Sequence, residues 1–225
     1  MKDAGVPLRG LLKASFNREQ YIDTIRSYAR IQISCVKHLD DLVAIGLDDW
    51  RLQNLPSLYR NFITQDELLQ DDGMSDVEIH SLQSHANKLY SILEELSSCG
   101  IPETIEHGDF HDNNILIKDG IHTISDWGDV SISHPFFSCA GMLGSAKRHY
   151  PEVNIEPLQE EYLSAWKKYG SKKVLTQALD LAQKLRPFLF ALNFSRIKSD
   201  KDCDQFPEYK GYIADSLRDL LRNLA

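Results

Sequence analysis

Two short stretches of the sequence concentrate side chains that could do chemistry. Residues 107–117 contain Asp109 and, five residues later, Asn114, and residues 124–129 contain Asp126. Carboxylate and carboxamide oxygens are suitable ligands for Mg²⁺. A carboxylate, a carboxamide and a second carboxylate, in this order along the chain, suit phosphoryl transfer, which relies on positioning and electrostatics. We expect Asp109 to orient a hydroxyl group and accept its proton, while Asn114 and Asp126 hold Mg²⁺ at a bound triphosphate.

The segment between these stretches predicts how the three side chains meet. Apolar runs at 115–117 and 121–124 flank an Asp-Gly pair, which accepts the positive φ values of a tight hairpin turn. A hairpin centred on that pair places Asn114 opposite Ser125, next to Asp126. Cross-strand neighbours lie about 5 Å apart. We therefore expect Asn114 and Asp126 to meet at the open end of the hairpin.

The rest of the chain has the periodicity of helices, so the predicted fold class is α+β and mainly α-helical, with this hairpin as its sheet. Asn17 with Gln20, and Ser75 with Glu78, have the spacing of helix caps, and Pro187 should kink or divide a helix. Helices are expected at 17–46, 50–52, 56–62, 75–98, 136–143, 157–169, from 171 through 185, and at 208–224. Loops are expected at 66–73 and 198–205.

Composition limits the classes of function. The formal charge of −8 argues against nucleic-acid binding, which needs a basic surface, and favours polar or cationic small molecules. The sequence contains neither a secretory signal nor an apolar run of about 20 residues, so we predict no membrane partner. Its four cysteines are widely spaced, without metal-ligand spacing, which indicates a reduced, cytoplasmic setting. We expect a connecting segment over 1–15 and a single domain over 16–225.

The two motifs carry a family resemblance. His107-Gly108-Asp109 with Asn114, followed by Asp126-Trp127-Gly128-Asp129, resembles the catalytic loop and metal-binding motif of the aminoglycoside phosphotransferase and choline kinase-like family. That family shares the protein-kinase-like fold. The resemblance implies that Asp109 is the catalytic aspartate, Asn114 a metal ligand, and Asp126 the residue that bridges metal and nucleotide phosphates. It also implies ATP or another nucleoside triphosphate, Mg²⁺, and a small polar or cationic substrate bearing a hydroxyl group.

The resemblance covers the larger, C-terminal lobe of such kinases. The segment 1–15 resembles the chain just after the hinge between the lobes, and the sequence has no glycine-rich phosphate loop or lysine-bearing strand before it. We therefore expect weak or no turnover by this chain alone, with a missing N-terminal lobe or self-association as candidate partners. A second departure is His134-Pro135, where the family often has an Asp-Pro pair.

Four neighbouring residues are candidates for contact with the substrate or for support of the loop: His107, His111, Asp112 and Asp129. A structural hydrogen bond and a proton shuttle are alternatives for His107. Two alternative functions are a non-catalytic kinase-like binding module or pseudo-enzyme, and a dinuclear metallophosphoesterase. The latter would need further histidine and aspartate ligands.

Overall fold

The hairpin turn is formed by Asp119 and Gly120, whose φ angles are +50° and +75°. In the computed structural model, which describes residues 3–198 and 207–225, this turn joins β4 (Ile115–Lys118) to β5 (Ile121–Ile124). The two strands pair in the register expected from a turn centred on Asp-Gly. The predicted hairpin is therefore present, because a short aspartate and a glycine tolerate the left-handed backbone that the turn requires.

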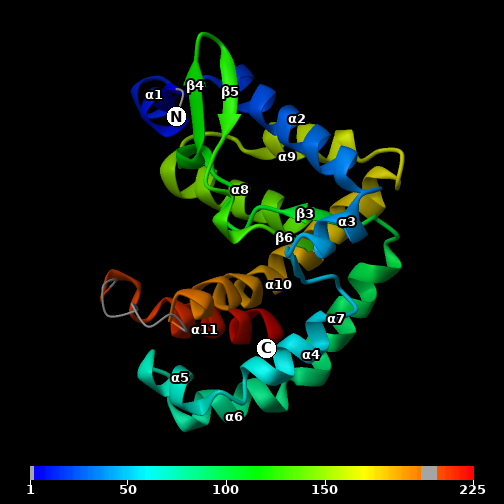
Figure 1. The fold of residues 1–225 in the computed structure, drawn as a ribbon, viewed down its shortest axis with the longest axis vertical. Coiled ribbons are helices and arrows are strands. Elements are labelled where there is room, and N and C mark those ends of the chain that lie inside the picture. Colours follow the sequence, from blue (N-terminus) through cyan, green and yellow to red (C-terminus); the bar gives the residue numbers. More distant parts are fainter. Residues whose placement is uncertain (1–2, 199–206) are drawn as a thin grey trace. The chain divides into compact units, whose positions relative to one another are not determined.

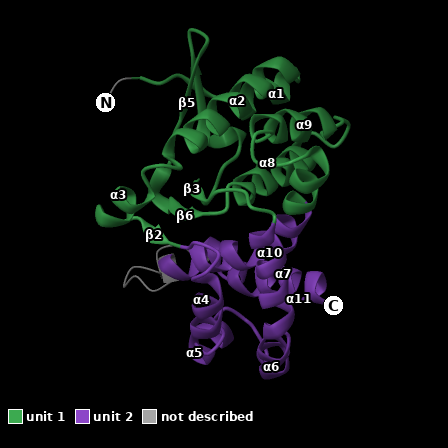
Figure 2. Ribbon diagram, turned by 90° about the vertical axis from the view of Figure 1, so that its right-hand side faces the viewer, with its two compact units in different colours: residues 1–49, 99–179 green, residues 50–98, 180–225 purple. Residues whose placement is uncertain are grey.

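The chain divides into two compact units, coloured separately in Figure 2. Unit 1 comprises residues 1–49 and 99–179, and it contains the hairpin and both motifs. Its helices and 3-10 turns are α1 (Leu8–Ala14), α2 (Arg18–Cys35), α3 (Leu39–Ala44), η1 (Asp112–Asn114), η2 (Trp127–Asp129), α8 (Phe136–His149) and α9 (Glu156–Ala165).

The described residues of unit 1, 3–49 and 99–179, form two small sheets where one was expected. In the first, β1 (Val6–Pro7) adds to the hairpin in the order β1-β4-β5. The second has the order β2-β6-β3, formed by β2 (Asp48–Asp49), β6 (Ser131–Ser133) and β3 (Thr104–Glu106). Its strands have two or three residues, too few for an alternating pattern to be recognised in the sequence. Figure 1 shows α1 and α2 on either side of the hairpin.

The core of unit 1 is organised by α2, which packs against α9 (Figure 1). Tyr28 and Gln32 of α2 are fully buried, as is Tyr162 of α9. The tyrosine hydroxyl groups and the glutamine amide need hydrogen-bond partners in such a place. Gln32 finds them in the carbonyl oxygen of Ile105, 2.9 Å away, and in the hydroxyl of Tyr162. Polar groups therefore connect α2 with β3 inside the core.

Unit 2 comprises residues 50–98 and 180–225. Its elements are α4 (Leu55–Phe62), α5 (Asp66–Asp71), α6 (Asp76–Ser84), α7 (Ala86–Ser98), η4 (Pro207–Tyr209) and α11 (Tyr212–Leu224), together with the second part of α10 (Lys172–Lys198), which begins in unit 1. Tyr59 and Phe188 meet edge to face at 5.1 Å in its core. Asp72 accepts hydrogen bonds from the backbone N–H groups of Gly211 and Ala214, and so caps α11.

Both predicted caps are present, but the long helices that they begin are shorter than expected. The helix expected at 17–46 ends at Cys35, where the N–H of His38 bonds to the Cys35 oxygen at 2.8 Å and tightens the last turn. None of the residues of α3 is buried, so no apolar face holds a continuous helix there. The helix expected at 75–98 breaks at His85, whose side chain competes for the carbonyl oxygen of Ser81.

Two further predictions in this region were wrong. The expected loop at 66–73 contains α5, because acidic residues suit a first helical turn and Leu69 is fully buried. The expected helix at 50–52 does not form, because Asp48, two residues before it, pairs with Ser131 between β2 and β6. By contrast, Pro56 lies in the first turn of α4, as predicted.

The expected connecting segment at 1–15 contains β1 and α1. Its position after a hinge between two lobes stays a prediction. The single domain expected over 16–225 stays a prediction as well. Pro187 does not divide α10, which runs through it. The expected loop at 198–205 lies outside the described residues except for Lys198, and Cys203 lies outside them as well. Among the helices of the described ranges, none combines the length and the apolar character needed to cross a membrane.

Candidate functional site

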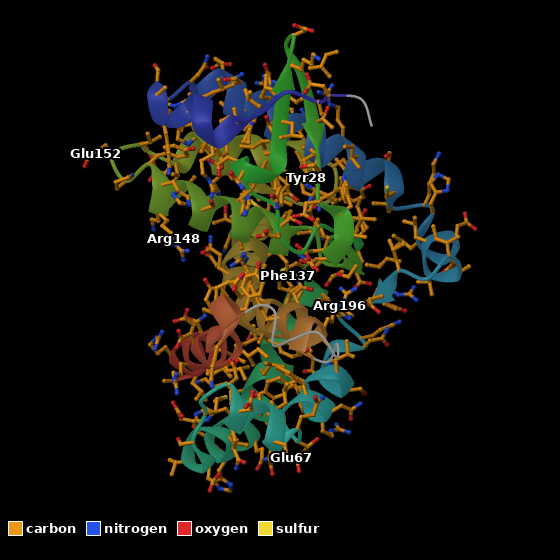
Figure 3. All side chains as sticks on the ribbon, turned by 60° about the vertical axis from the view of Figure 1, so that its left-hand side comes forward. Tyr28, Glu67, Phe137, Arg148, Glu152 and Arg196 are labelled. Atoms are coloured by element: carbon orange, nitrogen blue, oxygen red, sulfur yellow. The ribbon has the colours of Figure 1, made fainter. Side chains whose placement is uncertain are left out.

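The loop between β3 and η1 carries the first motif and is anchored at its centre by an aromatic side chain. Phe110 is buried and stacks on Tyr28 with the ring centroids 3.8 Å apart. Figure 3 labels Tyr28, which comes from α2. On the N-terminal side, Gly108 has a φ of +82°, a conformation that glycine adopts without strain. Asp109 therefore lies between Gly108, whose backbone is left-handed, and Phe110, whose ring is buried. The side chain of Asp109 is 40% exposed.

Asp109 is held by the next polar residues of the same loop. The side-chain amide of Asn114 donates to the main-chain oxygen and to Oδ2 of Asp109, at 3.0 and 3.1 Å. His111 Nε2 lies 3.2 Å from the same carboxylate oxygen. Burial alone would raise the pKa of Asp109, but His111 and Asn114 together lower it below its usual value. The carboxylate is consequently ionised at neutral pH and able to accept a hydrogen bond from a hydroxyl group.

His107 connects this loop to the second motif from inside. Its side chain is fully buried, and its Nε2–H donates to the carbonyl oxygen of Ser125 at 2.9 Å. The ring also packs against Trp127, with centroids 4.7 Å apart. Burial lowers the pKa of His107, although the carbonyl of Ser125 and the charges of Asp109 and Asp126 act in the opposite direction. A neutral, buried imidazole in this position fits the structural alternative that the sequence left open.

The two motifs meet at the open end of the hairpin. Both the backbone N–H and the hydroxyl of Ser125 donate to the carbonyl oxygen of Asn114, at 2.9 and 3.0 Å. Asn114 therefore lies opposite Ser125, as expected, and Asp126 follows immediately. Asp126 is exposed and has left-handed backbone angles, φ 63° and ψ 57°. Aspartate is one of the few residues other than glycine that adopt this conformation readily.

Asp112 lies on the inner side of the loop and is completely buried. Its carboxylate accepts hydrogen bonds from Arg9 Nε and Nη2, at 3.0 and 2.8 Å, and from the hydroxyl of Tyr150. Ser145 Oγ completes the group, 3.2 Å from Arg9 Nη2. Burial raises the pKa of Asp112, but Arg9 and Tyr150 outweigh it and hold the pKa below its usual value. This arrangement favours the supporting role over direct contact with a substrate.

No motif in the sequence pointed to Arg9 or Tyr150. Arg9 lies 103 positions before Asp112 and Tyr150 lies 38 positions after it, so no local pattern connects them. Asp129 is half-buried in the short turn η2, and its contact with a substrate stays a prediction. The same holds for His111, whose observed partner is Asp109.

The oxygen atoms at the hairpin end fit a hard divalent cation. The side-chain amide nitrogen of Asn114 donates to Asp109, so the oxygen of the same amide group is the end that can bind a metal. Asp126 adds an exposed carboxylate. Over residues 3–198 and 207–225, no group of three or more His, Cys, Asp or Glu side chains is arranged to hold a metal ion. A dinuclear metallophosphoesterase site would require such a group.

Comparison with known protein families gives a match over most of the chain. The model of the APH family, described as the phosphotransferase enzyme family, matches residues 9–176. This range is about three quarters of the chain, and it includes both motifs, Arg9 and Tyr150. Among curated proteins, no match to the chain was found.

Proposed function

Because this chain belongs to the phosphotransferase enzyme family, we propose that it transfers the γ-phosphate of ATP, or of another nucleoside triphosphate, to a hydroxyl group of a small molecule. The observation that carries the proposal is the joining of two motifs at one end of a hairpin. Asp109 is fixed by the side-chain amide of Asn114. The main-chain carbonyl oxygen of Asn114 accepts a hydrogen bond from Ser125, the residue before Asp126. In this proposal the chain corresponds to the large lobe of a kinase-like fold.

Asp109 orients the hydroxyl group and accepts its proton. Its lowered pKa keeps it ionised at neutral pH, which makes it a good hydrogen-bond acceptor and a weak base. A weak base is sufficient here, because the transition state of phosphoryl transfer is loose and depends mainly on position and charge. His111 restricts the rotation of the carboxylate through its contact at 3.2 Å.

Asn114 and Asp126 provide the oxygen ligands for Mg²⁺. When bound, Mg²⁺ would neutralise negative charge on the nucleotide phosphates. The amide of Asn114 serves two purposes at once, since its nitrogen holds Asp109 and its oxygen faces away from that carboxylate. The backbone of Asp126 is fixed by Ser125 and by η2, so its carboxylate starts from a defined position.

The substrate class follows from charge. With a formal net charge of −8, the protein favours the approach of a polar or cationic molecule over an anionic one. Amino alcohols, choline, aminoglycosides and sugars bear the required hydroxyl group. We place the reaction in the cytoplasm.

The test is phosphorylation by the full chain with Mg-ATP and a panel of these hydroxyl compounds, with product detected by mass spectrometry. Wild type is compared with Asp109→Asn and with the control Asp119→Asn. Asp119 is an exposed aspartate at the hairpin turn, and asparagine tolerates its positive φ. We expect phosphorylated product from wild type and the control, and none from Asp109→Asn. Absence of nucleotide binding by calorimetry, or equal product from all three proteins, would contradict the proposal.

A further inference from the structure

A second buried carboxylate lies directly before the catalytic loop, in a place that the motif does not include. Glu106 is the last residue of β3 and is 4% exposed. Its Oε2 accepts a hydrogen bond from the backbone N–H of Gly108 at 2.8 Å, and its Oε1 accepts one from Ser138 Oγ at 2.8 Å. An ionised carboxylate in the core is costly unless its oxygens are bonded in this way.

The hydrogen bonds that lead to Glu106 have a fixed direction. The hydroxyl oxygen of Tyr28 accepts from Gln32 Nε2 and from the N–H of His107, both at 3.2 Å. Its own proton is therefore directed to Ser138 Oγ, 2.6 Å away, and the proton of Ser138 is directed to Glu106. The chain of donors ends on the carboxylate, because a carboxylate accepts and does not donate.

The same group of side chains holds the first two N–H groups of the loop. The N–H of His107 bonds to Tyr28 and Ser138, and the N–H of Gly108 bonds to Glu106. Asp109 is the next residue. The loop thus leaves β3 with its backbone direction set from inside the core, and Gly108 supplies the left-handed turn at this point.

We propose that Glu106 is a positioning residue, which fixes Asp109 through the backbone of Gly108 and through Ser138. The catalytic consequence of this inference rests on the proposed function, whereas the positioning itself does not. A displacement of about 1 Å at a reacting group can reduce turnover about a hundredfold.

Glu106→Gln tests the direction of the hydrogen bonds with almost no change of shape. A glutamine can turn its oxygen to Gly108 or to Ser138, but its NH₂ group then meets a donor on the other side. One buried donor loses its acceptor in either orientation. The matched control is Glu94→Gln, the same substitution on an exposed face of α7.

The experiment combines two methods on the full chain. Nuclear magnetic resonance follows the backbone amide signals of Gly108 and Asp109, and steady-state kinetics gives kcat and KM. In folded Glu106→Gln we expect both amide signals to shift and kcat to fall about a hundredfold while KM changes little. A mere loss of folded protein would lower the apparent kcat without moving the amide signals of the molecules that are folded.

An unchanged Asp109 amide signal in folded Glu106→Gln would overturn the inference, whether or not the Gly108 signal moves. If wild type does not phosphorylate any compound, the proposed function fails while the two resonance measurements still decide the positioning. If Glu106→Gln does not fold, Ser138→Ala takes its place, since it removes a donor to the carboxylate of Glu106 and leaves the glutamate itself unchanged. We then expect the same changes at smaller size, and their absence would overturn the inference.

Discussion

Asn114 holds both the backbone and the side chain of Asp109 with a single amide group, through hydrogen bonds of 3.0 and 3.1 Å. A single bond to the carboxylate would leave the backbone free to shift, and a single bond to the backbone would leave the carboxylate free to rotate. The pair therefore defines the position of the proposed base. It also explains why a carboxamide, with one donor end and one acceptor end, is suited to this place.

The first prediction concerns this pair. Asn114→Asp keeps the size of the side chain but replaces the donor with a second negative charge. We expect the pKa of Asp109 to rise, because a neighbouring carboxylate disfavours its ionised form. We also expect kcat to fall by about a hundredfold or more, within the range for loss of a positioned acid or base. The control is Asn113→Asp at the adjacent exposed position, and equal kcat in the two variants would contradict the expectation.

The second prediction concerns the buried ion pair of Arg9 and Asp112. Arg9→Leu leaves a carboxylate without its charge partner in the core, which typically costs about 3 to 5 kcal/mol in the free energy of unfolding. Arg26, which forms an ion pair of 2.7 Å with Glu161 and is 45% exposed, provides the matched control. Exposed pairs contribute about 1 kcal/mol or less.

Urea unfolding followed by tryptophan fluorescence would measure both losses. Two of the three tryptophans, Trp127 and Trp166, lie in unit 1 with these ion pairs. A loss in Arg9→Leu no larger than that in Arg26→Leu would show that the buried pair contributes little.

Much of the site was predictable because its signals are local. The Asp-Gly turn determines the strand register, and the register brings Asn114 opposite Ser125. The caps at Asn17 and Ser75 were likewise readable, since each depends on a partner three residues away. In such cases the residues that determine the local geometry lie within a few positions of one another in the sequence.

The supports of the loop were not predictable, because they come from distant positions. Arg9, Tyr28 and Ser138 reach the loop only after α1, α2 and α8 have packed around it. Glu106 directly precedes the motif, but the residue type alone does not show whether its carboxylate is a buried hydrogen-bond acceptor or an exposed group at the end of a strand. Packing also accounts for the end of the first long helix at Cys35, since α3 buries no residue, whereas periodicity alone favoured a continuous helix at 17–46.

The third prediction concerns Asp126 and Mg²⁺. Asp126→Asn removes the charge while keeping a residue that tolerates a φ of 63°. We expect the Mg²⁺ concentration for half-maximal activity to rise about tenfold, equivalent to about 1.4 kcal/mol. Titration of activity with Mg²⁺ measures the change, and Asp119→Asn, with a φ of 50° in the native turn, is the control for the backbone. An unchanged Mg²⁺ requirement would exclude Asp126 as a ligand.

The last prediction concerns His134, at the position where the family often has an aspartate. The side chain is fully buried, and its Nδ1 accepts a hydrogen bond from the N–H of Phe136 at 3.2 Å, at the start of α8. Burial lowers the pKa of His134 to about 3. The unfolded chain, with a histidine pKa of about 6.5, therefore binds one more proton than the folded chain between these values. Stability consequently falls as the pH falls through this window.

Between pH 7 and pH 5 this histidine should reduce the free energy of unfolding by about 2 kcal/mol. His134→Asn keeps an acceptor for the N–H of Phe136 and does not titrate, so its unfolding free energy should lose about 2 kcal/mol less than wild type over the same interval. Urea unfolding of both proteins at the two pH values gives the comparison, in which the contributions of the other histidines cancel. Equal losses of unfolding free energy in wild type and His134→Asn would mean that His134 is protonated in the folded state. His134 would then cap α8 in another way.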